Sequence, residues 1–134
     1  MANLKRVKTV TLDLADKPGE LARVLAAYRE ANVDLVSTWG WSEGSGKASA
    51  VFIGKDPKRT EEVLKKMGAA YKTGEACLCE GDDRMGAVHD ILQKAAQSGV
   101  NLHAAGAIGT AGKYCAVVWA EEGQFDKLCK ALGC

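Results

Sequence analysis

The chain has 134 residues, enough for one ordinary domain or two small ones, and its 47% of apolar residues can fill hydrophobic cores. The 18 basic and 17 acidic residues nearly balance and only 6% of residues are aromatic, which excludes a strongly charged or base-stacking nucleic-acid surface. Neither an apolar signal segment at residues 1–6 nor a run of about 18 apolar residues occurs, so we expect a soluble, cytoplasmic protein that does not bind membranes.

The first predicted elements are a strand and a helix. Residues 10–14 alternate between apolar and polar side chains, as in a strand that buries one face. Pro18 suits the first turn of the helix that follows, because its missing N–H costs nothing there. The helix ends near Asn32, and its apolar stripe has the spacing i, i+3, i+4, i+7: Leu21, Val24, Leu25 and Tyr28.

A hairpin and a second helix follow. A strand from Val33 to about residue 41, a polar turn at 42–46 and a returning strand at 47–53 form the predicted hairpin. A helix then opens at Asp56-Pro57 and closes at Gly68. A last strand, around residues 70–72, is expected to run on into the next part of the chain.

The second half of the chain repeats this order. An equally spaced apolar stripe stands 67 residues after the first one: Val88, Ile91, Leu92 and Ala95. The turns before the two stripes correspond, as do the strand entries after them. The second repeat comprises a strand around residue 77, a helix at 86–97, a strand from residue 100, a hairpin turn at 109–112, a strand at 114–119 and a helix at 122–132.

The repeat predicts the fold class. Each copy reads as βαββα, with a fourth strand evident only where the copies join. The predicted fold is therefore α+β, with two tandem ferredoxin-like βαββαβ units whose antiparallel sheets carry both helices on one face. We assign residues 1–73 to the first domain and 74–134 to the second. Because the second repeat lacks a fourth strand of its own, we expect shared or swapped edge strands and a homodimer.

The residues around the first turn resemble an ACT domain. That family combines a strand, a D/N-x-P-G-x-L turn, an amphipathic helix and a G-[IV]-N-[IL] entry into the second strand. The first repeat matches the turn, as Asp16 to Leu21, and has Asp34 where asparagine is common. The second matches the strand entry, as Gly99 to Leu102, and has Met85 in place of the proline. The resemblance covers essentially the whole chain as two copies.

The resemblance implies a regulatory protein that is not an enzyme. It implies an amino acid or other small effector bound at the interface between two ACT units, and a separate regulated enzyme as partner. A ligand carboxylate would meet free N–H groups at a helix start, where glycine permits close approach. The implied ligand-binding residues are Asp16, Pro18, Gly19, Glu20, Leu21 and Asp34 in the first repeat, and Asp83, Met85, Gly86, Ala87, Val88 and Asn101 in the second.

Some of these residues also fit purely structural roles. Gly19 and Gly86 fit turn geometry alone, and Asp16 and Asp83 fit helix caps. The carboxylate of Asp34 would repel a ligand carboxylate but could hold an ammonium group, whereas an asparagine amide accepts either end of a ligand. The two sites are therefore expected to be unequal.

The cysteines are interpreted as packing residues. Five cysteines, an odd number in a chain without a signal segment, argue against a disulfide framework. Cys77 and Cys79 form C-x-C rather than C-x-x-C, and the repeat places them at the positions of Val10 and Leu12, on the helix-facing side of a strand. We therefore expect no metal site.

Other chemical motifs are weak. The lysines after the two hairpin glycines do not fit a phosphate-binding G-x-x-x-x-G-K-[ST] loop, and His89 and His103 stand in no recognisable catalytic pattern. We therefore expect no catalytic residue and no cofactor. Trp39 and Trp41 share strand parity with Leu35, which predicts packing in a core or an interface, with ligand stacking as the alternative.

Three functional hypotheses remain. The favoured one is an effector-binding regulatory protein. The second is a ligand-free interaction module whose exposed strand edges recruit a partner. The third is a small enzyme that uses cysteine or histidine.

Overall fold

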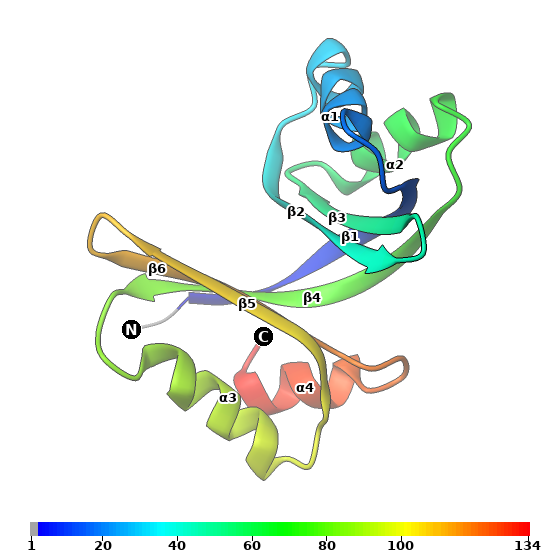
Figure 1. Cartoon of the computed structure of the whole chain (residues 1–134). Helices are drawn as coiled ribbons and strands as arrows, with labels where there is room; N and C mark the ends of the chain where they lie inside the picture. Colours follow the sequence, from blue (N-terminus) through cyan, green and yellow to red (C-terminus); the bar gives the residue numbers. More distant parts are fainter. Residues whose placement is uncertain (1–2) are drawn as a thin grey trace. The chain divides into compact units, whose positions relative to one another are not determined.

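The computed structural model describes residues 3–134, so residues 1 and 2 of the expected first domain lie outside the described range. It is an α+β protein, as predicted, with a six-stranded sheet in the order β2-β3-β1-β4-β6-β5 (Figure 1). The elements are β1 (Asn3–Ala15), α1 (Glu20–Glu30), β2 (Leu35–Gly44), β3 (Lys47–Gly54), α2 (Pro57–Lys66), β4 (Tyr71–Asp82), α3 (Ala87–Gln97), β5 (Leu102–Thr110), β6 (Lys113–Ala120) and α4 (Phe125–Leu132).

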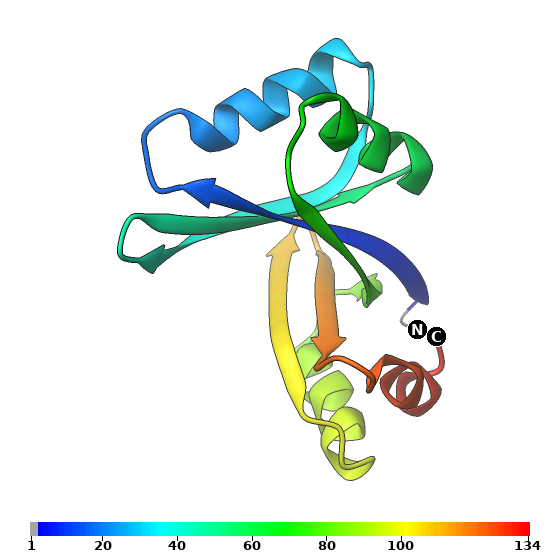
Figure 2. The same cartoon turned by 90° about the vertical axis from the view of Figure 1, so that its right-hand side faces the viewer.

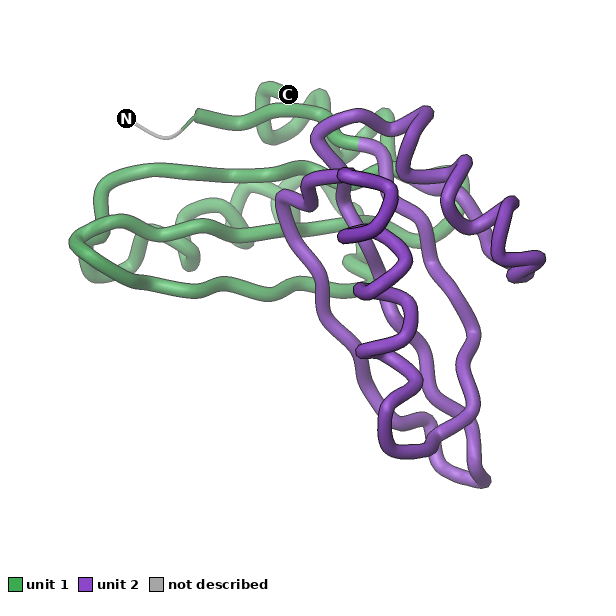
Figure 3. The backbone as a smooth tube through the Cα atoms, turned by 90° about the horizontal axis from the view of Figure 1, so that it is seen from above, with its two compact units in different colours: residues 1–7, 75–134 green, residues 8–74 purple. Residues whose placement is uncertain are grey.

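The chain forms two compact units that share two strands (Figure 3). The N-terminal unit is Lys8–Gly74, and the C-terminal unit joins residues 3–7 to Glu75–Cys134; Figure 3 labels them unit 2 and unit 1. β1 and β4 each run through both units. Residues 3–7, placed by the sequence-based division in the first domain, therefore provide the strand that the second repeat lacks.

The N-terminal unit is a sheet covered on one face by α1 and α2 (Figures 1 and 2). Its strands lie in the order β2-β3-β1-β4, and β3 pairs antiparallel with both β1 and β2. Tyr28 of α1 and Phe52 of β3 meet between the layers with ring centroids 5.3 Å apart. The Tyr28 hydroxyl donates to the Thr60 carbonyl of α2 at 3.1 Å, so this core joins both helices to the sheet.

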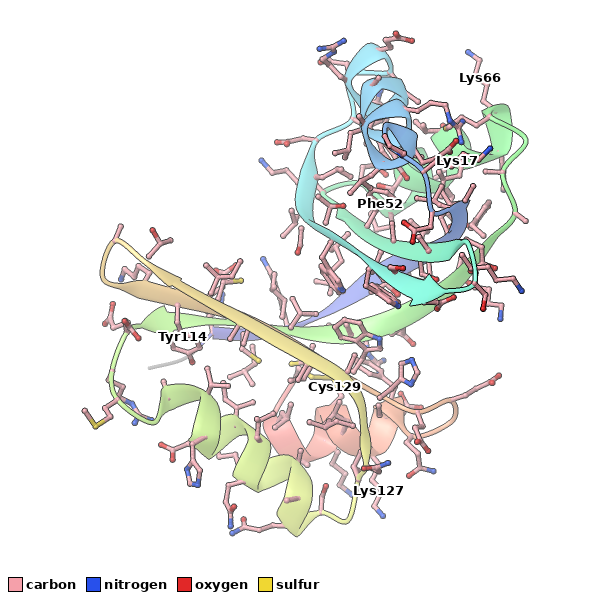
Figure 4. All side chains as sticks on the ribbon, in the orientation of Figure 1. Lys17, Phe52, Lys66, Tyr114, Lys127 and Cys129 are labelled. Atoms are coloured by element: carbon pink, nitrogen blue, oxygen red, sulfur yellow. A yellow bond between two sulfur atoms is a disulfide. The ribbon has the colours of Figure 1, made fainter. Side chains whose placement is uncertain are left out.

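The C-terminal unit repeats the arrangement with α3 and α4 over β4, β6 and β5. Cys77 and Cys79 are fully buried in the core beneath these helices, as predicted, with their Sγ atoms 3.9 Å apart. The hydrogen bond with the Cys77 thiol and, after it, burial raise the pKa of Cys79, so this thiol stays protonated. Figure 4 shows Tyr114 of β6 and Cys129 of α4 on the same side of this sheet.

The first residues of β1 are anchored within the C-terminal unit. Leu4 packs against its core. The Arg6 guanidinium pairs with Glu75 at 3.3 Å and with Asp126, and it lies 4.9 Å from the centroid of the Phe125 ring. One side chain thus connects β1 to both β4 and α4.

The two tryptophans of β2, Trp39 and Trp41, lie on the opposite face of the strand from Leu35. The prediction that they share a face with Leu35 was therefore wrong. A register shift between Leu35 and Ser37 interrupts the alternation. Leu35 packs against the core under the helices, whereas Trp39 pairs with Val51, a residue outside that core. β5 has the same irregularity between Leu102 and Ala104, so the bulge belongs to both repeats.

Two further expectations need correction. Pro18 precedes α1, whose N-cap is Gly19, so it does not occupy the first helical turn; Pro57 does so in α2. Cys129 and Cys134 form a disulfide across the end of α4, with Cα atoms 4.8 Å apart, although we expected none. The two cysteines are only five residues apart, so the disulfide is a local cross-link at the end of α4. An odd number of cysteines in the chain does not indicate such a bond.

Candidate functional site

Two glycine turns of the same conformation precede α1 and α3. Gly19 has φ 86° and ψ −9°, and Gly86 has φ 83° and ψ 4°, so both are left-handed N-caps. A β-carbon at either position would have no atom within 4 Å. Glycine is therefore required here by the backbone conformation, and the space above each turn is open.

The aspartates before these glycines hold the turns against the hairpins. The Asp16 N–H donates to Gly46 and the Asp83 N–H donates to Gly112, both at 2.9 Å. Neither side chain caps its helix, so the capping alternative was wrong. The Asp16 carboxylate accepts from Ser42 Oγ at 2.6 Å. In the second repeat Gly109 stands at the place of Ser42, and no such bond reaches Asp83 within residues 3–134.

The helix starts beside these turns are uncapped by side chains. In α2, by contrast, the Asp56 carboxylate accepts from the Lys58 and Arg59 N–H groups at 3.1 and 3.3 Å. α1 and α3 have no such bond, so the second and third N–H groups of each helix stay open to an anion. This is the feature that the glycine motif predicted.

The charged side chains at these helix starts pair locally. Glu20 pairs with Arg23 at 2.9 Å. In α3, Arg84 hydrogen-bonds to Asp90 at 2.6 Å and His89 lies 3.2 Å from the same carboxyl, and these two contacts lower the pKa of Asp90. Both acids sit in a first helical turn, where the helix dipole favours a negative charge.

The apolar candidates divide between packing and exposure. Ala87 is buried, and Leu21 and Val88 are partly buried against the cores, so these side chains anchor the helices. Met85 is 100% exposed, and Pro18 is exposed as well. Of the turn residues, the glycines, the open amides, Pro18 and Met85 remain accessible to a ligand.

The strand starts Asp34 and Asn101 also correspond. The Lys55 ammonium lies 2.6 Å from the Asp34 carboxylate, and its hydrogen bond lowers the pKa of that carboxyl. The Asn101 side-chain amide donates to Glu121 at 3.2 Å. Lys55 and Glu121 each directly follow the hairpin strand that pairs with the strand start: Leu35 pairs with Gly54 and Leu102 with Ala120.

Within each unit the glycine turn and the strand start lie at opposite ends of the sheet. Ala15, next to the first turn, pairs with Lys47 at the start of β3, while Leu35 pairs with Gly54 at the end of β3. The length of β3 puts roughly 20 Å between these ends. A single amino acid cannot touch both within one unit.

Other chemistry gains no support from the geometry. Among residues 3–134, no three His, Cys, Asp or Glu side chains gather as metal ligands would. His89 is exposed at the start of α3, and His103 lies at the bulge of β5. None of the helices in the described part of the chain is long and apolar enough to span a bilayer.

Comparison with known proteins shows the fold. No family model matches the chain, and no curated protein sequence does. Protein BT0572 from Bacteroides thetaiotaomicron is similar in structure, with a TM-score of 0.83 and 18% identity over 97% of this chain and 88% of that one. The ligand-free regulatory subunit of aspartate kinase from Thermus thermophilus has a TM-score of 0.68 and 16% identity, over 98% and 94%. The regulatory subunit of aspartate kinase from Thermus flavus has a TM-score of 0.63 and 16% identity, over 99% of this chain and 94% of that one.

Proposed function

We propose that this chain is a pair of ACT-type units that bind an amino acid and regulate a separate enzyme or pathway. The observation that carries the proposal is the duplicated glycine turn beside a helix start whose N–H groups have no side-chain cap. The fold shared with two regulatory subunits of aspartate kinase supports a regulatory role over a catalytic one.

The ligand would be held by its two charged ends. Its carboxylate would accept from the open N–H groups at α1 or α3, with Gly19 or Gly86 allowing close approach. Because a strand start lies too far away within the same unit, the other end of the ligand would meet Asp34 or Asn101 of a different unit, which we propose belongs to a second copy of the chain. The site therefore implies a homodimer.

A thermal-shift screen of the twenty amino acids and common nucleotides tests this function. A stabilising amino acid should raise the melting temperature in a concentration-dependent way, since a ligand that binds only the folded state stabilises it. Calorimetry should then give its affinity. Absence of binding below millimolar concentration for all twenty would contradict the proposal.

Three substitutions locate the site. Gly19→Val and Gly86→Val should each weaken binding at their own turn, because a bulky side chain blocks the approach to the helix start. Gly68→Val is the matched control: Gly68 also has positive φ and open space around it, but it ends α2. Asn101→Ala should weaken binding by roughly 0.5–1.5 kcal/mol, the usual net value of one hydrogen bond.

The exposed edge of β5 favours a second candidate function, that of a ligand-free interaction module. β5 ends the strand order, and residues 104–112 carry no charged side chain. Ile108 on this strand is 72% exposed. Natural edge strands usually carry charges or proline that block further pairing, so an uncharged edge suits strand addition by a partner. The interaction-module function becomes the favoured hypothesis if no small molecule binds.

A further inference from the structure

The two repeats differ in charge at the strand starts. In the N-terminal unit Asp34 carries an internal ammonium group, that of Lys55, at 2.6 Å. In the C-terminal unit Asn101 corresponds to Asp34 and Glu121 to Lys55, so this pair contains a carboxylate and no cation. Among residues 3–134, Glu121 forms no ion pair within 4.0 Å; its side chain accepts only from Asn101.

One lysine of the C-terminal unit lies near the end of α3. Lys127 of α4 has its Nζ 3.9 Å from where a β-carbon on Gly99 would lie, at the C-terminal end of α3 (Figure 4). Arg59 of α2 serves the same end of α1, donating to the Ala31 carbonyl at 2.6 Å. Each unit thus has a basic side chain near the C-terminus of its first helix, whereas the cation at the strand start belongs to the N-terminal unit alone.

Acceptor atoms remain available in the C-terminal unit. A carboxylate has about four lone-pair sites and an ammonium group has three N–H donors. Glu121 uses one site on Asn101, which leaves its second oxygen and the Asn101 Oδ1 without a partner in the described part of the chain. These two atoms occupy the place that Asp34 and the Lys55 ammonium fill in the other unit.

The glycine turns differ in the same direction. Ser42 donates to Asp16 in the N-terminal unit, whereas Gly109 offers no donor to Asp83 in the C-terminal unit. At both ends, then, the N-terminal unit satisfies its acidic group with its own side chain. The C-terminal unit leaves Asp83, the second Glu121 oxygen and Asn101 Oδ1 without a side-chain donor among residues 3–134.

We propose that Asn101 and Glu121 bind the ammonium group of an external ligand, and that the Lys55 ammonium occupies the equivalent place in the N-terminal unit and closes it. The proposal rests on the proposed function, since it names the ligand end that the strand start takes. Under this proposal, Lys55 and Glu121 determine which repeat binds the ligand's ammonium group. Each chain then has one ammonium site.

Ethylammonium chloride is the probe, followed by ¹H–¹⁵N NMR of the full chain at constant ionic strength. It should shift the Asn101 side-chain amide and the backbone amides around Glu121 saturably, while Asp34 and Lys55 stay unchanged. Tetramethylammonium chloride, which has the charge without N–H donors, should give no saturable shift there. Because the probe is not an amino acid, this experiment can succeed or fail independently of the amino-acid screen.

Three variants complete the test. Glu121→Gln should weaken ethylammonium binding about tenfold or more, a loss of about 1.4 kcal/mol. Glu122→Gln, the same change at the next residue, should leave it within about twofold of the wild type, as expected for a group that makes no contact with the probe. Lys55→Met should create a second saturable shift, at Asp34. Wild-type shifts of equal size at Asp34, or shifts that survive Glu121→Gln, would overturn the proposal.

Discussion

Gly54 determines how closely α2 approaches β3. A β-carbon at this position would lie 1.7 Å from Thr60 Oγ1 and 2.9 Å from Thr60 Cβ. The Thr60 side chain cannot turn away freely, because its hydroxyl donates to the Asp56 carbonyl at 2.7 Å and the residue is buried. Glycine is therefore required here by packing, in contrast to the turn glycines.

Gly54→Ala should consequently lower the free energy of unfolding by about 2–3 kcal/mol, the cost of overpacking a tight core. Urea denaturation measures the change. Gly106→Ala is the control, because a β-carbon there meets nothing within 4 Å, and it should change stability by less than about 0.5 kcal/mol. Equal effects of the two substitutions would contradict the packing argument.

The ion pair of Asp34 and Lys55 makes a pH-dependent prediction. Because the pKa of Asp34 is lowered in the folded state, its contribution to stability is present above the unfolded pKa, about 3.9, and is lost as pH falls through the folded pKa. Lys55→Met should raise the Asp34 pKa toward 3.9 in an NMR titration of the carboxyl carbon. Lys113→Met, which frees Asp82 instead, should leave the Asp34 pKa unchanged.

The sequence predicted the positions of single residues where the internal repeat determined them, and failed where a backbone irregularity or a hairpin register determined them. Cys77 and Cys79 were predictable because the repeat aligned them with core residues of the first copy. The faces of Trp39 and Trp41 were not, because one extra residue in the bulge reverses every side chain after it and leaves no mark in composition. The Asp16 bond to Ser42 needed the hairpin register, which sequence spacing leaves open.

At the scale of elements, Arg6 is the residue that fastens the first segment of β1 to the C-terminal unit. Arg6→Ala removes its two ion pairs and its contact with the Phe125 ring. We expect a loss of about 1 kcal/mol, since partly exposed pairs are weak and the aromatic contact adds a similar amount. Hydrogen exchange at residues 3–7 should accelerate most.

Two comparisons sharpen this test. Arg6→Lys keeps the charge but loses the planar group, so it should fall between wild type and Arg6→Ala. Lys5→Ala, a change at an exposed neighbour, should leave exchange at these residues unaltered. Faster exchange throughout the N-terminal unit instead would contradict the assignment of residues 3–7.

Helices and strands were predicted in the correct order because local periodicity and turn residues determine them. A shared strand for the second repeat was predicted, but the residues that supply it were not identified, because they lie about 70 positions earlier, where no local pattern indicates pairing. The β–α–β connection also separates the two halves of the candidate site. α1 carries the chain back along the sheet, so the motif before it and the motif after it lie at opposite ends of the strands.

For the whole molecule we predict a homodimer. β2 and β5 end the strand order, and Ile108 exposes an apolar side chain on an uncharged edge. Light scattering should give twice the chain mass at high micromolar concentration. Ile108→Lys should increase the monomer fraction, whereas Glu62→Lys, which also introduces a lysine but on the exposed side of α2, should leave it unchanged. A monomeric wild type at that concentration would count against this prediction.

The two strands that pass through both units affect how the protein folds. Residues 3–7 find their partners only after the chain has closed a loop of about 70 residues, and such closures slow folding because their entropy is lost before any contact forms. The C-terminal unit cannot be cut out as a continuous segment, because Lys8–Gly74 separates residues 3–7 from Glu75–Cys134. Unfolding of the N-terminal unit would turn Lys8–Gly74 into a long flexible connection between residues 3–7 and their partners, and the entropy of that loop would weaken the C-terminal unit. A calorimetric scan should therefore show one cooperative transition, with equal van't Hoff and calorimetric enthalpies.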